Sequence, residues 1–214
     1  MSDNKKNPII LNEITSQQAR TTYWDRKYEE DTPIWDRNYP SPLLVNAIEQ
    51  NLIKQGTVIS IGCGTGTNEI YLATKGFTVT AIDLSKNAIN IAIDKASKAN
   101  VTINWICGDI LNLPNNLSTY DIIFDRGCYH HIRYSFLQKY IESLCQLSHD
   151  NTKCLIISCN DNKPPGVTKN HITSDFASCK TKQFNITQLK AIKSNDQKGE
   201  RNEWVLLMDI INKQ

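Results

Sequence analysis

Short apolar runs alternate with amphipathic segments along most of the chain, and this alternation predicts its secondary structure. Strands are expected at 57–61, 77–82, 101–107, 120–124 and 154–159. Helices are expected at 16–30, 41–55, 67–75, 85–100 and 134–147. Because strands and helices follow one another in turn after residue 57, the pattern predicts an α/β fold with a mostly parallel sheet and helices on both faces.

The C-terminal part departs from this alternation. Two strand-like runs, 184–194 and 203–211, are joined by a polar stretch at 195–202. They predict a β-hairpin added to the parallel sheet. A chain of 214 residues suits one domain with a sizeable core, and we expect residues 1–214 to form a single domain.

The first strand of the alternating region ends in a glycine loop that indicates a ligand site. The apolar run 58–61 stops at Gly62, Gly64 and Gly66, and Asp83 ends the next apolar run, 21 residues after Gly62. Glycines let a ligand approach the backbone closely, and a carboxylate at the tip of the neighbouring strand can bind two ribose hydroxyls. The stretch therefore predicts a nucleoside cofactor.

The spacing of the glycines argues against two common nucleotide sites. A dinucleotide-binding loop has the pattern G-x-G-x-x-G, whereas here the third glycine comes one residue early and Thr67 stands in its place. A P-loop is excluded because no Gly-Lys-Ser/Thr follows. An NAD-dependent oxidoreductase is thus disfavoured.

Three aspartates follow strands that are expected to be neighbours. Asp83, Asp109 and Asp125 each come at the end of an apolar run. Aspartate also caps helices and turns, but the carboxyl ends of parallel strands are where ligands bind in open α/β sheets. The three carboxylates together favour a ligand site.

In order and spacing, the glycine loop, Asp83, the Gly108-Asp109-Ile110 turn and the hairpin resemble the S-adenosylmethionine-dependent methyltransferases with a class I Rossmann-like fold. The resemblance covers about residues 20–212 and implies a seven-stranded sheet whose last strand is antiparallel. It also implies S-adenosylmethionine as cofactor. The implied cofactor-binding residues are Gly62, Cys63, Gly64 and Gly66 for the methionine part, Asp83 and Leu84 for the ribose, and Asp109 and Ile110 for the adenine.

The flanking segments resemble a narrower group, the thiopurine methyltransferases with their thiol, halide and tellurite-linked relatives. The similar stretches are 23–28, 32–36, the Phe124-Asp125-Arg126-Gly127 motif and Pro164-Pro165-Gly166. This resemblance implies that residues 1–55 form a helical lid or extension in which Trp24 and Trp35 cover the cofactor. It further implies that Asp125 contributes to the cofactor and catalytic site and that Arg126 reaches the reacting groups.

The next residues leave two acceptor classes open. Positive charge from Arg126 would favour a thiolate, which predicts a thiol or other soft nucleophile as acceptor. The run 128–132 instead resembles the histidine-containing turn of general small-molecule methyltransferases, and His130 or His131 could take a proton from a hydroxyl or amine. A protein that binds S-adenosylmethionine without catalysis is disfavoured, since the aspartates and Arg126 are all retained.

Composition narrows the remaining choices. The net charge of +2 gives no sign of a nucleic-acid or acidic-membrane partner, so a small-molecule substrate is expected. The seven cysteines form no CxxC pair and no zinc-finger spacing, which predicts reduced thiols and no metal site. Residues 1–7 are polar, unlike a signal peptide, and no apolar run reaches membrane-spanning length. We expect a soluble cytoplasmic protein; the sequence leaves the oligomeric state open, with a monomer favoured.

Overall fold

The computed structural model describes residues 16–30, 33, 35–161, 166–177, 181–196 and 199–213. The helices are α1 (Gln17–Glu30), α2 (Pro42–Glu49), α3 (Thr67–Thr74), α4 (Lys86–Lys98), α5 (Tyr129–Leu147) and α6 (Lys169–Asp175). The strands are β1 (Thr57–Ile61), β2 (Thr78–Asp83), β3 (Asn104–Cys107), β4 (Tyr120–Arg126), β5 (Ser148–Cys159), β6 (Lys182–Asp196) and β7 (Gly199–Asn212).

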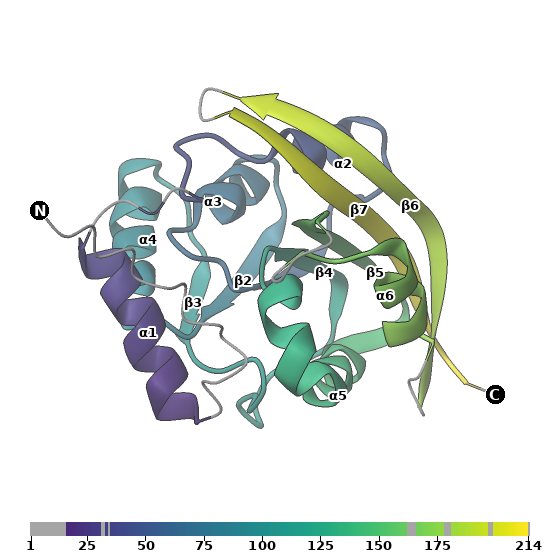
Figure 1. Ribbon diagram of the computed structural model, residues 1–214. Coiled ribbons are helices and arrows are strands. Elements are labelled where there is room, and N and C mark those ends of the chain that lie inside the picture. The colour runs from purple at the N-terminus through teal and green to yellow at the C-terminus, as the bar shows by residue number, and fades with distance from the viewer. Residues whose placement is uncertain are drawn as a thin grey trace, which may run out of the picture.

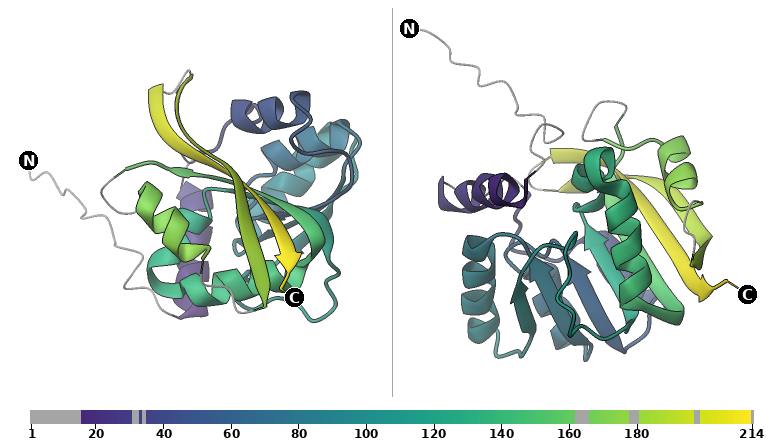
Figure 2. Two further views of the ribbon diagram at one scale, coloured as in Figure 1. Left: turned by 90° about the vertical axis from the view of Figure 1, so that its right-hand side faces the viewer. Right: turned by 90° about the horizontal axis from the view of Figure 1, so that it is seen from below.

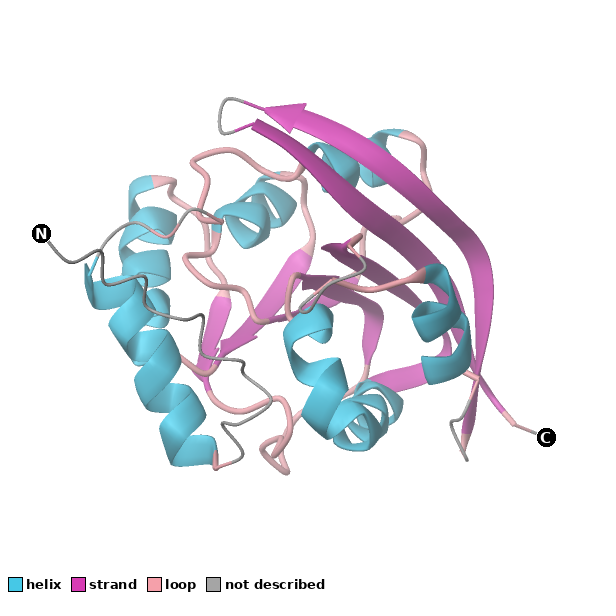
Figure 3. Cartoon of the chain, in the orientation of Figure 1, coloured by secondary structure: helices cyan, strands magenta, loops and turns pink. Residues whose placement is uncertain are grey.

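The strands form one seven-stranded sheet in the order β3-β2-β1-β4-β5-β7-β6 (Figure 1). The five strands from β3 to β5 are parallel, and β7 inserts antiparallel between β5 and β6. Helices lie on both faces of the sheet, and the long β6–β7 hairpin curves along one side of it (Figure 3). The predicted α/β class, strand number and C-terminal hairpin are confirmed.

Alternating side chains of the central strands supply a core on each face of the sheet. On one face, Ile59 of β1 belongs to the same buried cluster as Tyr140 and Leu144 of α5. On the opposite face, Val58 of β1 clusters with Leu72 of α3. This packing holds the carboxyl ends of the strands, where the predicted site residues lie, as one rigid edge.

Three local differences from the expected boundaries have visible causes. Helix α2 ends at Glu49 because the chain turns back there, with Asn51 at a φ of 54°. Helix α5 begins at Tyr129, earlier than expected, because Asp125 accepts hydrogen bonds from the first amides of the helix. Helix α6 was not expected; Thr168 and His171 form a capping box that starts it.

The N-terminal helix lies beside α4, as Figures 1 and 2 both show. Its Asp25 accepts hydrogen bonds from the Ser85 hydroxyl at 2.7 Å and from the Asn87 amide at 3.3 Å. This polar contact places α1 over the carboxyl edge of β2. Among the helices that the structure describes, none is long and apolar enough to cross a membrane.

Candidate active site

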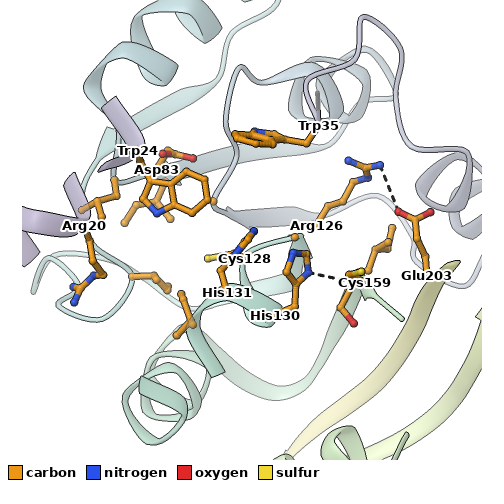
Figure 4. A pocket seen from close by; sticks show the side chains of 18 of the residues that line it. Arg20, Trp24, Trp35, Asp83, Arg126, Cys128, His130, His131, Cys159 and Glu203 are labelled. Atoms are coloured by element: carbon orange, nitrogen blue, oxygen red, sulfur yellow. Dashed lines mark hydrogen bonds and ion pairs between the residues drawn. The ribbon is translucent and has the colours of Figure 1, made fainter. Parts of the chain in front are cut away.

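A cavity of about 550 Å³ opens at the carboxyl ends of the parallel strands (Figure 4). Its walls come from α1, the ends of β1–β5, the start of α5 and the start of β7. The predicted site residues that line it are Trp24, Trp35, Gly62, Asp83, Leu84, Asp109, Ile110, Arg126, His130 and His131. The fold thus brings together side chains that lie far apart in the sequence.

The glycine loop is shaped by its close neighbours. Gly62 has a φ of +62°, and a Cβ there would lie 2.8 Å from the Cβ of Cys128. Gly64 has a φ of +55°, and a Cβ there would lie 2.9 Å from the Tyr28 hydroxyl. Both positions therefore require glycine, and the bare backbone of Gly62 forms part of the cavity wall.

Asp83 at the end of β2 is held by two backbone amides. One carboxylate oxygen accepts from the Gly64 amide at 2.7 Å and the other from the Ser85 amide at 2.8 Å. The side chain is buried, and burial raises the pKa of Asp83. Because each carboxylate oxygen has a second lone pair, the group can still accept hydrogen bonds from two hydroxyls of a ligand.

Asp109, after β3, is joined to the N-terminal helix. It forms an ion pair with Arg20 of α1, and its other oxygen accepts from the Leu111 amide at 3.0 Å. The Arg20 guanidinium also stacks over the Phe136 ring, 4.6 Å from its centroid. Arg20 also lines the cavity, although no sequence motif marks it; its position one helical turn before Trp24 is the only signal.

Aromatic rings from α1 and the following segment cover this part of the cavity. Trp24 and Trp35 meet edge to face with centroids 5.9 Å apart. The Trp35 indole donates a hydrogen bond to the Tyr28 hydroxyl at 3.1 Å. The Trp24 ring also meets the His131 ring, with centroids 5.2 Å apart. Burial raises the pKa of Tyr28, so its phenol stays neutral. These rings could face a cationic ligand.

On the far side of the cavity, Arg126 at the end of β4 faces Glu203 of β7 at 3.6 Å (Figure 4). The Arg126 side chain is 16% exposed, and its buried Nε has no hydrogen-bond partner among the described residues. Burial lowers the pKa of Arg126, but an arginine remains a cation. Glu203 was missed in the sequence because only strand pairing brings β7 to this edge.

His130 and His131 lie side by side, with ring centroids 4.4 Å apart. The His130 Nδ1 accepts from the Cys159 amide at 3.2 Å, so in the neutral ring the proton lies on Nε2. Burial lowers the pKa of His130 and brings that of His131 to about 4. Both rings are therefore neutral at pH 7, and the buried Nδ1 of His131 has no partner within the described ranges.

Four predicted site residues lie outside the lining of this cavity. Asp125 is fully buried and accepts from the amides of Cys128 and Tyr129 at 2.9 Å each and from the Tyr140 hydroxyl at 2.7 Å. Its position is that of a helix cap that orients the 126–131 turn, and burial raises its pKa to about 6. The other three are Cys63, Gly64 and Gly66. Cys63 and Gly64 border a smaller cavity instead, and Gly66 borders neither.

Gly66 serves packing. Its φ is +77°, and a Cβ there would lie 2.5 Å from the Trp105 ring and 2.9 Å from Ala92. This close approach seats the start of α3 against α4 and β3. Over the described ranges, no group of three His, Cys, Asp or Glu side chains is placed to hold a metal ion.

Residues 58–150 match a family described as a methyltransferase domain. An uncharacterized methyltransferase of Schizosaccharomyces pombe is 33% identical over 110 residues, which span 50% of this chain and 76% of that protein. The chain belongs to the S-adenosylmethionine-dependent methyltransferases. This methyltransferase is thus an enzyme in which the nucleoside expected from the glycine loop is S-adenosylmethionine.

Solved structures share the fold of the methyltransferase. One was described for the conversion of a disulfide bond into a thioacetal group during echinomycin biosynthesis; it has a TM-score of 0.77 at 22% identity, covering 89% of this chain and 91% of that one. Another is the magnesium protoporphyrin IX methyltransferase of Synechocystis with bound S-adenosylmethionine, with a TM-score of 0.66 at 14% identity, covering 91% and 97%.

The cavity of the methyltransferase fits S-adenosylmethionine. Its volume of about 550 Å³ lies in the range of small-molecule sites, roughly 300–1,000 Å³. It offers the bare Gly62 backbone, the Asp83 carboxylate with free lone pairs and the faces of Trp24 and Trp35. These groups match a ligand with ribose hydroxyls and a cationic sulfonium.

Proposed function

We propose that this enzyme methylates a small-molecule thiol or another soft nucleophile, as in the thiopurine and thiol methyltransferase group that the sequence resembles. One observation carries the proposal. Arg126 holds a largely buried positive charge at the cavity wall, with a buried Nε that lacks a hydrogen-bond partner among the described residues. A fixed cation beside the acceptor stabilises its anionic form, and a thiol ionises more readily than a phenol.

In this proposal the cofactor occupies the side of the cavity under α1. Asp83 accepts hydrogen bonds from the ribose hydroxyls, with Leu84 beside it, while Asp109 and Ile110 meet the adenine. Gly62, Cys63 and Gly64 border the methionine part, and Trp24 and Trp35 cover the sulfonium. The part of residues 1–55 that the structure describes, 16–30, 33 and 35–55, then acts as a lid. Two observations support this arrangement: two backbone amides hold the Asp83 carboxylate, and a hydrogen bond from Ser85 to Asp25 holds α1 beside it.

S-adenosylmethionine supplies an electrophilic methyl group on a good leaving group, so the protein contributes mainly alignment. Holding the reacting atoms about 3–3.5 Å apart can account for about 7–11 kcal/mol of the barrier. Arg126 raises the thiolate fraction of an acceptor with a pKa of about 8.5. Asp125 is a positioning residue: by accepting hydrogen bonds from two amides, it orients the turn that carries Arg126 and the histidines.

A second acceptor class has an observation of its own. The buried Nδ1 of His131 has no partner within the described ranges and could accept a hydrogen bond from a hydroxyl or amine. With a pKa of about 4, His131 is a weak base, so it orients such a group better than it deprotonates it. His130 can donate from Nε2. An O- or N-methyltransferase is therefore the alternative proposal.

The test is an assay of S-adenosylhomocysteine release with thiols, halide, tellurite, catechols and amines as acceptors. We expect the highest kcat/KM with a thiol or another soft nucleophile, rising with pH as the acceptor ionises. Turnover of a phenol or amine without turnover of any soft nucleophile would favour the alternative. The neighbour linked to the conversion of a disulfide bond into a thioacetal supports the inclusion of sulfur acceptors.

A further inference from the structure

A smaller cavity of about 60 Å³ lies beside the glycine loop. It shares Tyr28, Trp35, Gly62 and Arg126 with the large cavity, so the two adjoin at these residues. The rest of its lining is mostly polar and includes Glu69. The glycine loop forms one of its walls, but no sequence motif marked the other walls, which come from β1, α3, the 35–41 segment and β4.

Glu69 is the buried acid of this cavity. It lies in the first turn of α3 and is 1% exposed. One carboxylate oxygen accepts from the Ser60 hydroxyl at 2.6 Å, whereas the other is buried with no hydrogen-bond partner among the described residues. The Ser41 hydroxyl and the Arg126 Nε, which border the same cavity, are likewise buried without partners in that part of the chain.

Several unpaired polar atoms around one small cavity indicate a polar ligand group. A buried polar atom without a hydrogen-bond partner destabilises the folded protein, and such atoms are rare in native proteins. A carboxylate suits a cationic donor, and the Arg37 guanidinium, which borders the same cavity, suits an anion. The ligand chemistry that fits both is a zwitterion, with an ammonium and a carboxylate on adjacent atoms.

S-adenosylmethionine has such a zwitterion at its amino-acid end, and its adenine end has none. Asp83 binds two amides and Asp109 binds Arg20, and both line only the large cavity. Asp36 also borders the small cavity, but it accepts from the Thr65 hydroxyl at 2.6 Å and pairs with Lys95 at 3.7 Å. We propose that Glu69 is a further cofactor-binding residue that accepts a hydrogen bond from the α-ammonium group of S-adenosylmethionine. This assignment concerns the cofactor alone and does not depend on which acceptor is methylated.

The electrostatics around Glu69 make this contact sensitive to pH. The pKa of Glu69 is raised to about 7, mainly by burial and to a lesser extent by Asp83, whereas the Ser60 hydroxyl, a backbone hydrogen bond and Arg126 lower it. The other charged or titratable side chains that border the cavity are Tyr28, Asp36, Arg37, Tyr39 and Cys63. Only the ionised carboxylate pairs with an ammonium, so the contribution of Glu69 to cofactor affinity is larger at pH 8 than at pH 6.

The experiment is titration calorimetry of the full chain with S-adenosylhomocysteine and with its analogue that lacks the α-amino group. Glu69→Gln keeps the side-chain shape and the Ser60 contact but removes the charge. We expect it to weaken S-adenosylhomocysteine binding about tenfold, or about 1.4 kcal/mol. Binding of the deaminated analogue should stay within twofold of wild type, and the loss should shrink between pH 8 and pH 6.

Glu142→Gln on the exposed side of α5 is the matched control and should bind both ligands like wild type. An equal loss for both ligands in Glu69→Gln would show a structural role and overturn the assignment, as would unchanged affinity for S-adenosylhomocysteine. Thermal unfolding of each variant verifies that the fold is kept. Neither outcome bears on the thiol proposal, since no acceptor is present in this measurement.

Discussion

The cavity wall under α1, at the ends of β1, β2 and β3, differs from the wall formed by β4, α5, β5 and β7. The first is held by backbone groups: the carboxylate of Asp83 binds two amides, and Gly62 has no room for a side chain. The second is made of side chains, with an Arg126–Glu203 pair at 3.6 Å and with Arg126 Nε and His131 Nδ1 lacking a hydrogen-bond partner in the part of the chain that the structure describes.

This difference matches two tasks of the site: binding a cofactor that does not vary, and binding an acceptor that does. Backbone contacts place the first wall with little freedom, which suits a cofactor that is the same in every methyltransferase of the family. The second wall can change by substitution without disturbing the sheet, which suits the choice of acceptor. The comparison therefore predicts that substitutions on the first wall affect cofactor binding and those on the second wall affect acceptor turnover.

The largest effect is expected from Asp83→Ala. Loss of two charge-assisted hydrogen bonds to ribose should weaken S-adenosylhomocysteine binding about 100-fold, measured by calorimetry. Asp83→Asn keeps one carbonyl acceptor, so its affinity for S-adenosylhomocysteine should fall less than that of Asp83→Ala. Unchanged affinity in a folded Asp83→Ala protein would mean that the ribose lies elsewhere.

On the second wall, Arg126→Leu should lower kcat/KM for a thiol about 30-fold, because the thiolate loses its cation. Glu203→Gln keeps the shape of the side chain that faces Arg126 but removes its charge, and it should lower kcat/KM for a thiol about threefold. Steady-state kinetics with a thiol series measure both. If kcat/KM in Arg126→Leu fell equally for thiols and for uncharged acceptors, Arg126 would serve structure instead of acceptor ionisation.

The smallest effect is expected from His131→Asn when a thiol is the acceptor. Because the pKa of His131 is lowered to about 4, the ring is already neutral above pH 5, and the pH–rate profile between pH 5.5 and 8 should show no histidine step. Turnover of the thiol should change less than about threefold. A loss confined to a hydroxyl or amine acceptor would instead support the O- or N-methyltransferase alternative.

Much of the fold follows from local pattern. Strand β1 occupies the predicted residues Thr57–Ile61, and Ser85 caps α4 by accepting from the Ala88 amide at 3.1 Å. The start of α5 was misplaced because its cap, Asp125, was interpreted as a ligand residue. Local pattern does not decide every side chain, since Ile93 of α4 is 44% exposed whereas its neighbour Ala92 is fully buried.

The sequence by itself determined the parallel sheet, the hairpin and the nucleoside loop, because each depends on residues that are neighbours along the chain. Only the tertiary structure decided how distant charges meet. Arg20 and Asp109 are 89 residues apart, and β7 brings Glu203 to Arg126 through strand pairing. Glu69 resembles an exposed acid at a helix N-terminus, and its burial against Ser60 depends on how α3 packs on β1. Side-chain pairing across a sheet edge depends on packing, which a local pattern does not encode.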